Sequence, residues 1–240
     1  MAKQKFDQTE ENLANIEEAI GKTEKFVENN KNNLSYGVIA IFAIVLIVMG
    51  YNKYIRVPNQ EAAYSNIWHA EQYFNMDSLD WALNGHADYP GFLEIIDDFG
   101  STPSGNLANY YAGISYFRMA QNDTTAQAAE YYESAIDYLE NFSSDDLNVK
   151  PMAIGAIGDC YMELGEQEKA AKYYLEAAHL NDNEFISPIF LKKAGMTYAL
   201  LGNHEKALEA YKEIKTKYNS SQEGSEIKKY IGREEAILGE

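Results

Sequence analysis

Cysteine, proline and basic residues are scarce in this 240-residue chain. Its single cysteine, Cys160, excludes a disulfide within the chain and a zinc site built from several cysteines. Only five prolines are present, which favours packed helices because proline breaks a helix interior. The 20 Lys and Arg residues stand against 37 Asp and Glu residues, a net charge of −17. This balance argues against a nucleic-acid-binding protein, which needs a basic face for phosphates.

The excess negative charge is confined to one part of the chain. Residues 1–57 carry seven basic and seven acidic side chains, whereas residues 58–240 carry 13 basic and 30 acidic ones. The second part therefore has the surface expected of a soluble domain, one that repels anionic lipid headgroups and nucleic acid.

Residues 34–51 form one uncharged run, LSYGVIAIFAIVLIVMGY. As a helix it would span about 27 Å, close to the roughly 30 Å apolar core of a bilayer. A buried helix of a soluble core is the alternative, which the absence of a polar face disfavours. A cleaved signal peptide would start earlier, behind a positive segment, and end at a small-residue cleavage site. We therefore predict an uncleaved transmembrane helix.

The lysines and arginine that flank this run indicate its orientation. Lys22, Lys25 and Lys31 precede it, while Lys53 and Arg56 follow it. Basic residues are more frequent on the cytoplasmic side of a span, so this small excess favours a cytoplasmic N-terminus.

The segment before the run, residues 1–33, carries a short heptad pattern. Phe6, Leu13, Ile20 and Val27 are spaced seven residues apart. This spacing predicts a short amphipathic helix. It is either a marginal helix near the membrane or a docking helix for a partner protein.

The second part of the chain contains an internal repeat. Two stretches that begin 37 residues apart carry small and aromatic residues at the same spacing. Pro151 lies seven residues before the first stretch, and Pro188 lies seven residues before the second. The shared positions are Gly158, Tyr161, Gly165, Ala170, Tyr174 and Ala177 in one stretch, and Gly195, Tyr198, Gly202, Ala207, Tyr211 and Ile214 in the other, with isoleucine replacing the last alanine. A small residue lets a paired helix approach, an aromatic fills the space, and the second glycine allows a tight turn.

The spacing resembles the tetratricopeptide repeat, a helix–turn–helix unit, over residues 151–218. We therefore predict an all-α fold, with a single N-terminal transmembrane helix at 34–51 followed by a tetratricopeptide-repeat α-solenoid at 58–240. Within this domain we expect irregular leading helices at 60–100, repeats at about 104–141, 151–181 and 188–218, and a capping helix at 221–238.

Catalytic motifs are not evident. His69, His86, His179 and His204 lie in separate segments without metal-ligand spacing, and His86 with Asp88 is better explained as a polar pair in a turn. Cys160 is expected to be a buried structural thiol. We therefore predict a protein that is not an enzyme and has no cofactor or metal.

The first helix of each tetratricopeptide pair lines a concave groove, which is the expected site for a protein partner. Helical spacing from the repeat glycines places seven candidate side chains there. They are Tyr110, Ile114, Phe117, Asp159, Met162, Lys192 and Met196. Burial against a neighbouring repeat is the alternative for each of them.

The whole layout resembles a narrower family. The stretch EKFVENNKNN, one span, GYNKYI and then the repeats are similar to the ancillary SecYEG translocon subunit family (YfgM-like). This resemblance implies a bacterial inner-membrane protein with a cytoplasmic N-terminus and a periplasmic repeat domain. It further implies partners among SecYEG, periplasmic chaperones and exported chains. A general cell-envelope scaffold and an enzyme with a dispersed site are the two alternatives.

Overall fold

The computed structural model describes the backbone of residues 2–239 and the side chains of residues 21–239. The chain divides into two compact units, Met1–Pro58 and Asn59–Glu240. Helices account for all the regular elements of residues 2–239, apart from one isolated β-bridge between His86 and Tyr89. The architecture is therefore all-α.

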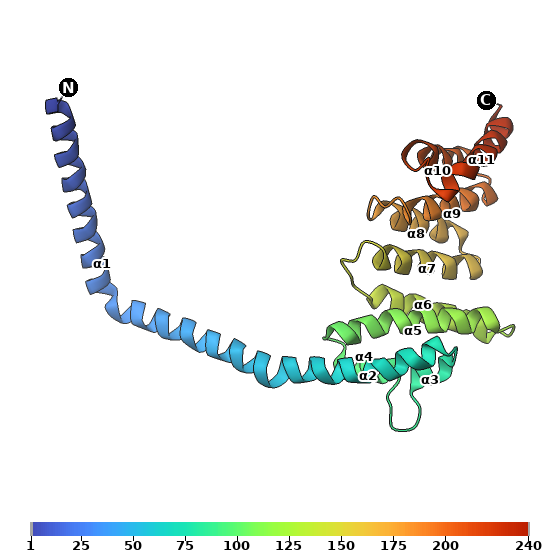
Figure 1. Cartoon of the computed structure of the whole chain (residues 1–240), viewed down its shortest axis with the longest axis horizontal. Helices are drawn as coiled ribbons and strands as arrows, with labels where there is room; N and C mark the ends of the chain where they lie inside the picture. The colour runs from blue at the N-terminus through green and yellow to red at the C-terminus, as the bar shows by residue number, and fades with distance from the viewer. Residues whose placement is uncertain (1, 240) are drawn as a thin grey trace. The chain divides into compact units, whose positions relative to one another are not determined.

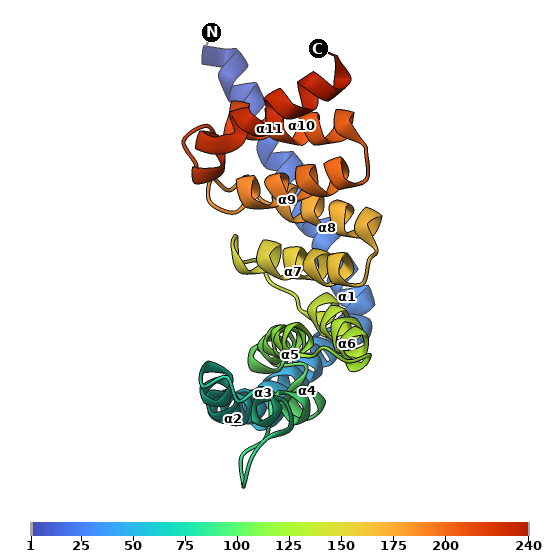
Figure 2. The same ribbon diagram turned by 90° about the vertical axis from the view of Figure 1, so that its right-hand side faces the viewer.

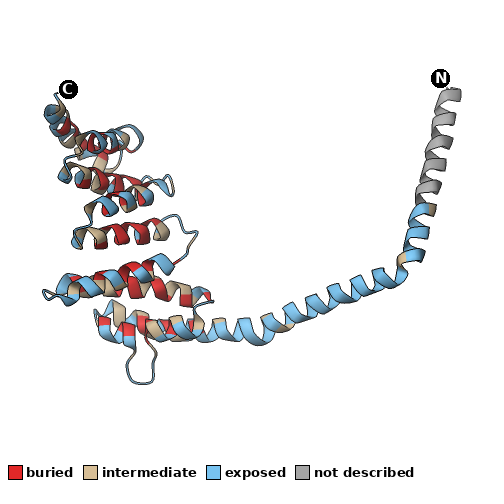
Figure 3. Cartoon of the chain, turned by 180° about the vertical axis from the view of Figure 1, so that it is seen from behind, coloured by how far each residue is buried: buried red, intermediate tan, exposed pale blue. Residues whose placement is uncertain are grey.

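The first unit is dominated by helix α1 (Ala2–Tyr51). Every side chain from Leu34 to Met49 is exposed, as Figure 3 shows by the continuous pale blue of this part of the helix. Within the described side chains, one helical stretch has the length and apolar composition needed to cross a membrane. Phe6, Leu13 and Ile20 of the heptad pattern lie outside the residues whose side chains are described, and Val27 is exposed.

A π-helical segment (Asn52–Arg56) joins α1 to α2 (Val57–Asn75). Pro58 lies in the first turn of α2 and has no backbone N–H to donate to the preceding turn. The N–H of Val57 instead donates to the carbonyl oxygen of Asn52, five residues earlier. The wider turn therefore carries the helix past a proline without a break.

The second unit is a stack of short helices that follow one another in chain order (Figure 1). Figure 2 shows the same stack from the side, with α7 and α9 in successive layers. After α2 come α3 (Leu79–Asn84), α4 (Phe92–Phe99), α5 (Pro103–Asn122), α6 (Gln127–Asn141), α7 (Val149–Glu163), α8 (Gln167–His179), α9 (Ser187–Leu200), α10 (His204–Lys217) and α11 (Gln222–Leu238).

Close packing within two helix pairs depends on a glycine beneath a tyrosine ring. A Cβ atom added at Gly158 on α7 would lie 2.7 Å from the ring of Tyr174 on α8, and one at Gly195 on α9 would lie 2.4 Å from the ring of Tyr211 on α10. Both distances are shorter than a van der Waals contact. In the α5–α6 pair the residue over Gly113 is Leu139, not an aromatic.

Gly165 and Gly202 form the turns within these pairs. Their φ angles are 77° and 75°, in the left-handed region that favours glycine. At the first turn the N–H of Glu166 donates to the carbonyl oxygen of Tyr161, and at the second the N–H of Asn203 donates to that of Tyr198. These bonds satisfy carbonyl groups at the end of the preceding helix.

Gly202→Ala is expected to cost about 1–2 kcal/mol of stability, because an L side chain is strained in this conformation. A Cβ atom there would meet no other atom within 4 Å, so the cost comes from the backbone alone. Gly232→Ala is the matched control, since Gly232 lies inside α11 with open space around it. This control should gain roughly 0.5–1 kcal/mol. Thermal unfolding of both variants in detergent measures the difference, and equal effects would refute the strain argument.

Polar contacts between neighbouring pairs run in a regular series. Lys193 on α9 pairs with Asp159 on α7 at 2.7 Å, and His179 on α8 contacts Glu213 on α10 at 3.1 Å. Each pair is separated by 34 residues, three fewer than the 37 that separate equivalent positions. Each side chain therefore reaches about one helical turn back along the next repeat.

Candidate protein-binding groove

Exposed apolar side chains recur at helical spacing on α9, and α7 carries one, Met152, at the position equivalent to the first of them. Met152 and Ile189 each follow one of the repeat prolines and are 46% and 39% exposed. Met196 and Leu200 continue the same face of α9 and are 49% and 62% exposed. Residues seven and four positions apart share a helix face, so Ile189, Met196 and Leu200 form one stripe on α9.

The stripe on α9 opens into a cavity of about 490 Å³ against α10 and α11. We call this cavity the C-terminal groove. Its apolar lining comes from the exposed stripe of α9 and from α11, and its polar groups are a histidine and an arginine. The lining residues are Met196, Ala199, Leu200, His204, Tyr230, Arg233 and Ile237.

Three of the predicted groove residues lie on α5 and are half-buried. The ring of Tyr110 lies 5.3 Å from that of Phe142, and the ring of Phe117 lies 5.9 Å from that of Tyr132. Ile114 packs against the same core, which α5 to α8 share. Burial raises the pKa of Tyr110 above its ordinary value. These side chains therefore support the core with one part of their surface and leave the other part accessible.

Asp159 and Lys192 are engaged between neighbouring helices. Asp159 accepts hydrogen bonds from the hydroxyl of Tyr174 at 2.6 Å and from Lys193 at 2.7 Å. Lys192 donates to Glu226 at 3.3 Å. Burial, and then the bond to Asp159, raise the pKa of Tyr174. Both charged candidates thus already hold neighbouring helices together.

The two methionine candidates differ in exposure. Met162 is half-buried, and its sulfur accepts a weak hydrogen bond from the hydroxyl of Thr197 at 3.6 Å. Met196 is exposed and stands 37 residues after Asp159, at the equivalent position of the next repeat. The hydroxyl of Tyr211, equivalent to that of Tyr174, is buried without a hydrogen-bond partner among the described residues. The change from aspartate to methionine therefore makes this end of the stack more apolar.

A buried carboxylate underlies the C-terminal groove. Glu234 is fully buried and accepts hydrogen bonds from Nδ1 of His204 at 2.6 Å and from Nε of Arg233 at 2.8 Å. Burial by itself raises the pKa of Glu234, but these two bonds outweigh it and hold the pKa below its ordinary value. Glu234 is therefore an anion that fixes two of the groove's polar side chains in place.

Six residues that line the C-terminal groove were not singled out by the repeat spacing. They are Ala199, Leu200, His204, Tyr230, Arg233 and Ile237. Leu200 lies four residues after Met196, so its place on the same face was available from helical spacing. The three residues of α11 were not, because this helix lacks the repeat's glycine–tyrosine spacing.

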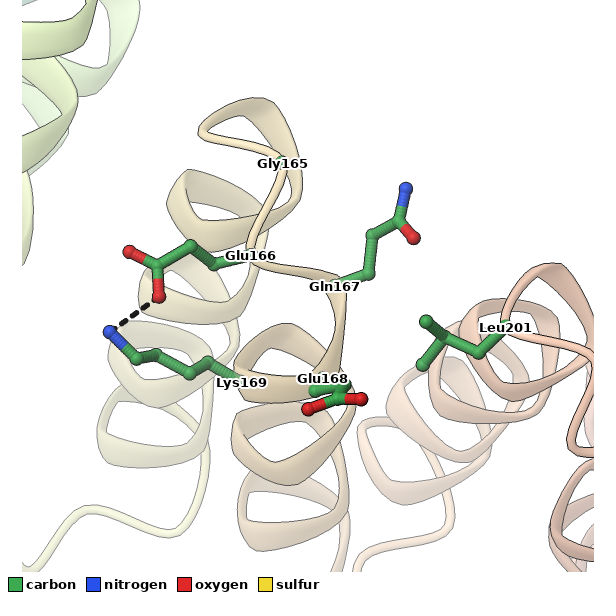
Figure 4. Close-up of a pocket in the computed structure, with 6 residues that line it drawn as sticks. All are labelled: Gly165, Glu166, Gln167, Glu168, Lys169 and Leu201. Atoms are coloured by element: carbon green, nitrogen blue, oxygen red, sulfur yellow. Dashed lines mark ion pairs between the residues drawn. The ribbon is translucent and has the colours of Figure 1, made fainter.

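The remaining titratable candidates do not assemble into a reactive site. Among residues 21–239, no group of three or more His, Cys, Asp or Glu side chains could hold a metal ion. His179 pairs with Glu213, and His86 stacks on Trp81 with ring centroids 4.0 Å apart. Figure 4 shows a second cavity, of about 350 Å³, between the Gly165 turn and Leu201. An ion pair between Glu166 and Lys169 borders it on an exposed surface.

Cys160 is expected to be unreactive in the folded chain. Its side chain is fully buried, and burial, with the nearby charge of Asp159, raises the pKa of its thiol to about 12. The thiolate is the reactive form, so almost none is present near neutral pH. A maleimide reagent should label the native chain in detergent at least about a hundredfold more slowly than the denatured chain. Rapid labelling of the native chain would show that the thiol is accessible.

Comparisons with known proteins identify the repeat directly. Residues 193–221 match the tetratricopeptide repeat family model. This stretch contains Gly195, Gly202 and Tyr211, which pack or turn as described above. The match therefore covers the second half of α9, all of α10 and the glycine–tyrosine contact between them.

Two curated proteins are similar over part of their length. The chain is 38% identical over 90 residues to photosystem I assembly protein Ycf3 from Synechococcus sp. (strain CC9605), covering 37% of this chain and 45% of that protein. It is 26% identical over 159 residues to a TPR repeat-containing protein from Methanocaldococcus jannaschii, covering 64% of this chain and 25% of that protein. The chain thus spans less than half of the length of the curated relatives it matches.

Two solved structures have some likeness to this chain. Nearly identical TPR-like repeats from Podosopora anserina give a TM-score of 0.49 at 12% identity, covering 75% of this chain and 88% of that one. MamA gives a TM-score of 0.43 at 22% identity, covering 62% and 79%. The family-model match and the helix packing together establish the predicted fold: one long apolar helix followed by a tetratricopeptide-repeat solenoid.

Proposed function

We propose that this chain is a non-catalytic, membrane-anchored module that binds other proteins through the face formed by α5, α7, α9 and α11. The observation that carries the proposal is the C-terminal groove, where Met196, Leu200 and Ile237 are each about half exposed or more. An apolar cavity rimmed by polar groups is the surface expected at a protein-binding site. The tetratricopeptide repeat match at residues 193–221 also suggests that the partners are proteins.

The anchor in this proposal is the run 34–51 of α1. Its side chains are exposed throughout. Exposure of so much apolar surface is unfavourable in water but not in lipid. The backbone hydrogen bonds of the run are satisfied within the helix, as lipid requires. The N-terminus then lies in the cytoplasm and residues 58–240 lie outside it, in the direction that the flanking lysines favour.

The narrower proposal is association with the Sec translocon in a bacterial inner membrane, with SecYEG, periplasmic chaperones or exported chains as partners. The support for it is the likeness of the juxtamembrane sequence and span to the SecYEG-associated family. A general cell-envelope scaffold would use the same groove. Affinity purification of the full chain from detergent-solubilised membranes, followed by mass spectrometry, separates the two. Translocon subunits above the level of a span-only control support the first, and a different membrane complex supports the second.

Protease added to spheroplasts tests the topology. The repeat domain should be digested, while residues 1–33 should stay protected by the membrane. An epitope tag at each end, read on immunoblots before and after lysis, measures both outcomes, and lysed cells are the control for protease access. Protection of the repeat domain with loss of the N-terminal tag would establish the opposite orientation.

A further inference from the structure

A second exposed surface lies at the other end of the stack, on α2, α3 and the loop between α3 and α4. Trp68, Trp81 and Tyr89 are 55%, 44% and 45% exposed. With histidine and tyrosine rings they form two groups of ring contacts, which the backbone bridge between His86 and Tyr89 links, and we call the whole the aromatic surface. Its members are Trp68, His69, Tyr73, Trp81, His86 and Tyr89. Exposed large rings in contact with one another mark an interaction site more often than isolated ones do.

The ring contacts fall into two groups, one of Trp68, His69 and Tyr89 and one of Tyr73, Trp81 and His86. His69 contacts Trp68 edge-on at 4.8 Å and stacks on Tyr89 at 3.6 Å between centroids. His86 stacks on Trp81 at 4.0 Å. The backbones of His86 and Tyr89 are joined by a pair of hydrogen bonds, so the two stacks share one support.

The loop that carries these rings is closed tightly. Gly85 has a φ angle of 84°, and a Cβ atom there would lie 2.6 Å from the carbonyl oxygen of Tyr89. A Cβ atom at Gly91 would lie 2.2 Å from the carbonyl oxygen of Leu83. The two ends of the loop are therefore pressed together, and the loop projects from α3 and α4 (Figure 1). This arrangement holds the exposed rings in a preformed position.

The surroundings of the aromatic surface are strongly acidic. Residues 59–148 contain 15 Asp and Glu residues and one basic residue, Arg118. Arg118 is already paired with Asp77 at 2.6 Å and lies over the ring of Phe74 at 4.9 Å. Glu61, Asp80 and Asp88 are exposed, and none of the described cations forms an ion pair with them.

We propose that the aromatic surface docks a basic, arginine-containing segment of a partner protein. A guanidinium group stacks on Trp and Tyr rings and forms paired hydrogen bonds with carboxylates, so it matches both components of this surface. Trp68, Trp81 and Tyr89 supply the rings, while Asp80 and Asp88 supply the carboxylates. Nucleic acid and anionic lipid are repelled by the same negative charge. This proposal is independent of the C-terminal groove, since it uses other helices.

The two tryptophans of the chain, Trp68 and Trp81, both belong to the aromatic surface. Intrinsic tryptophan fluorescence of the full chain in nonionic detergent therefore reports on this surface alone. The quenching constant of each ion is divided by its value for free N-acetyltryptophanamide, because iodide quenches free indole more efficiently than caesium does. At matched low ionic strength, this normalised constant should be at least about twofold larger for caesium than for iodide, because negative charge concentrates cations. Equal normalised constants, or a larger one for iodide, would overturn the charge argument.

Binding is measured with a twelve-residue peptide of Arg, Gly and Ser that has no aromatic residue. It should change the tryptophan emission and saturate, and a peptide with Lys in place of Arg should bind roughly threefold to tenfold more weakly because Lys stacks poorly. Asp80→Asn with Asp88→Asn should weaken binding about tenfold. The matched control, Glu133→Gln with Asp137→Asn on α6, removes the same charge elsewhere and should weaken binding less than about twofold.

Two further results decide the proposal. Leu200→Ser with Ile237→Ser alters the C-terminal groove and should leave peptide affinity unchanged, so failure of one site is distinguishable from failure of the other. No emission change with the arginine peptide, or equal loss of affinity in the α6 control, would overturn the proposal. The proposal would also be overturned if both tryptophans were shielded from caesium and iodide in phosphatidylcholine nanodiscs. That result would identify lipid as the molecule that covers the aromatic surface.

Discussion

Gly158→Leu is expected to lower the free energy of unfolding by about 3 kcal/mol and Tm by roughly 6–12 °C. The reason is the position of the Tyr174 ring, which would lie 2.7 Å from a Cβ atom at residue 158. This ring cannot easily move aside, because its hydroxyl is bound to Asp159 at 2.6 Å and Asp159 is in turn bound to Lys193. The leucine would therefore separate α7 from α8 and strain the contact between two repeats.

Thermal unfolding of the full chain in detergent, followed by circular dichroism at 222 nm, measures this effect. Gly232→Leu is the control, because a side chain at that position on α11 meets open space. A double-mutant cycle of Gly158→Ala and Tyr174→Ala isolates the contact, since removal of the ring should make room for the new methyl group. An unchanged Tm for Gly158→Leu, or additive effects in the cycle, would show that the glycine is not needed for close packing.

Leu200→Ser with Ile237→Ser is expected to weaken partner binding tenfold or more. The two side chains are 62% and 53% exposed, so their loss should cost the free chain little stability. In a complex they would be buried, and each such apolar side chain contributes about 1.5–3 kcal/mol, with 1.4 kcal/mol equal to a factor of ten. The amount of each partner protein that co-purifies with the variant from solubilised membranes, quantified by mass spectrometry, measures the loss of binding.

Phe185→Ser is the matched control for this experiment. Phe185 is 81% exposed in the segment between α8 and α9, outside the lining of the C-terminal groove. The control variant should keep its partners. Full retention by the groove variant, once its unfolding temperature is shown to be unchanged, would exclude the groove as the binding site.

The repeat was readable in the sequence because its packing depends on residue types at fixed steps. Gly158 with Tyr174, and Gly195 with Tyr211, are small and large residues that must meet in every pair, so selection for packing leaves a repeated spacing. Gly165 and Gly202 are similarly required by a positive φ angle. Local geometry of this kind is encoded within one repeat.

Contacts between repeats were not readable in the same way. Asp159 and Lys192 were predicted to line the groove, but their ion-pair partners, Lys193 and Glu226, were not foreseen. Each partner stands 34 residues away, a step that differs from the 37-residue spacing of equivalent positions. The availability of Asp159 and Lys192 to a partner protein stays a prediction, as does that of Tyr110, Ile114, Phe117, Met162 and Met196. The aromatic surface could not be predicted either, because residues 62–91 follow no repeat and the ring contacts depend on the fold of one loop.

The most direct test of the central proposal is a photo-crosslinking residue placed at Leu200 in cells and activated in intact membranes. Leu200 lies in the lining of the C-terminal groove, and Lys215, exposed on α10, is the control position. The proposed protein-binding function predicts a discrete crosslinked protein from position 200 and none from position 215. No crosslink at 200, or the same products from both positions, would contradict it.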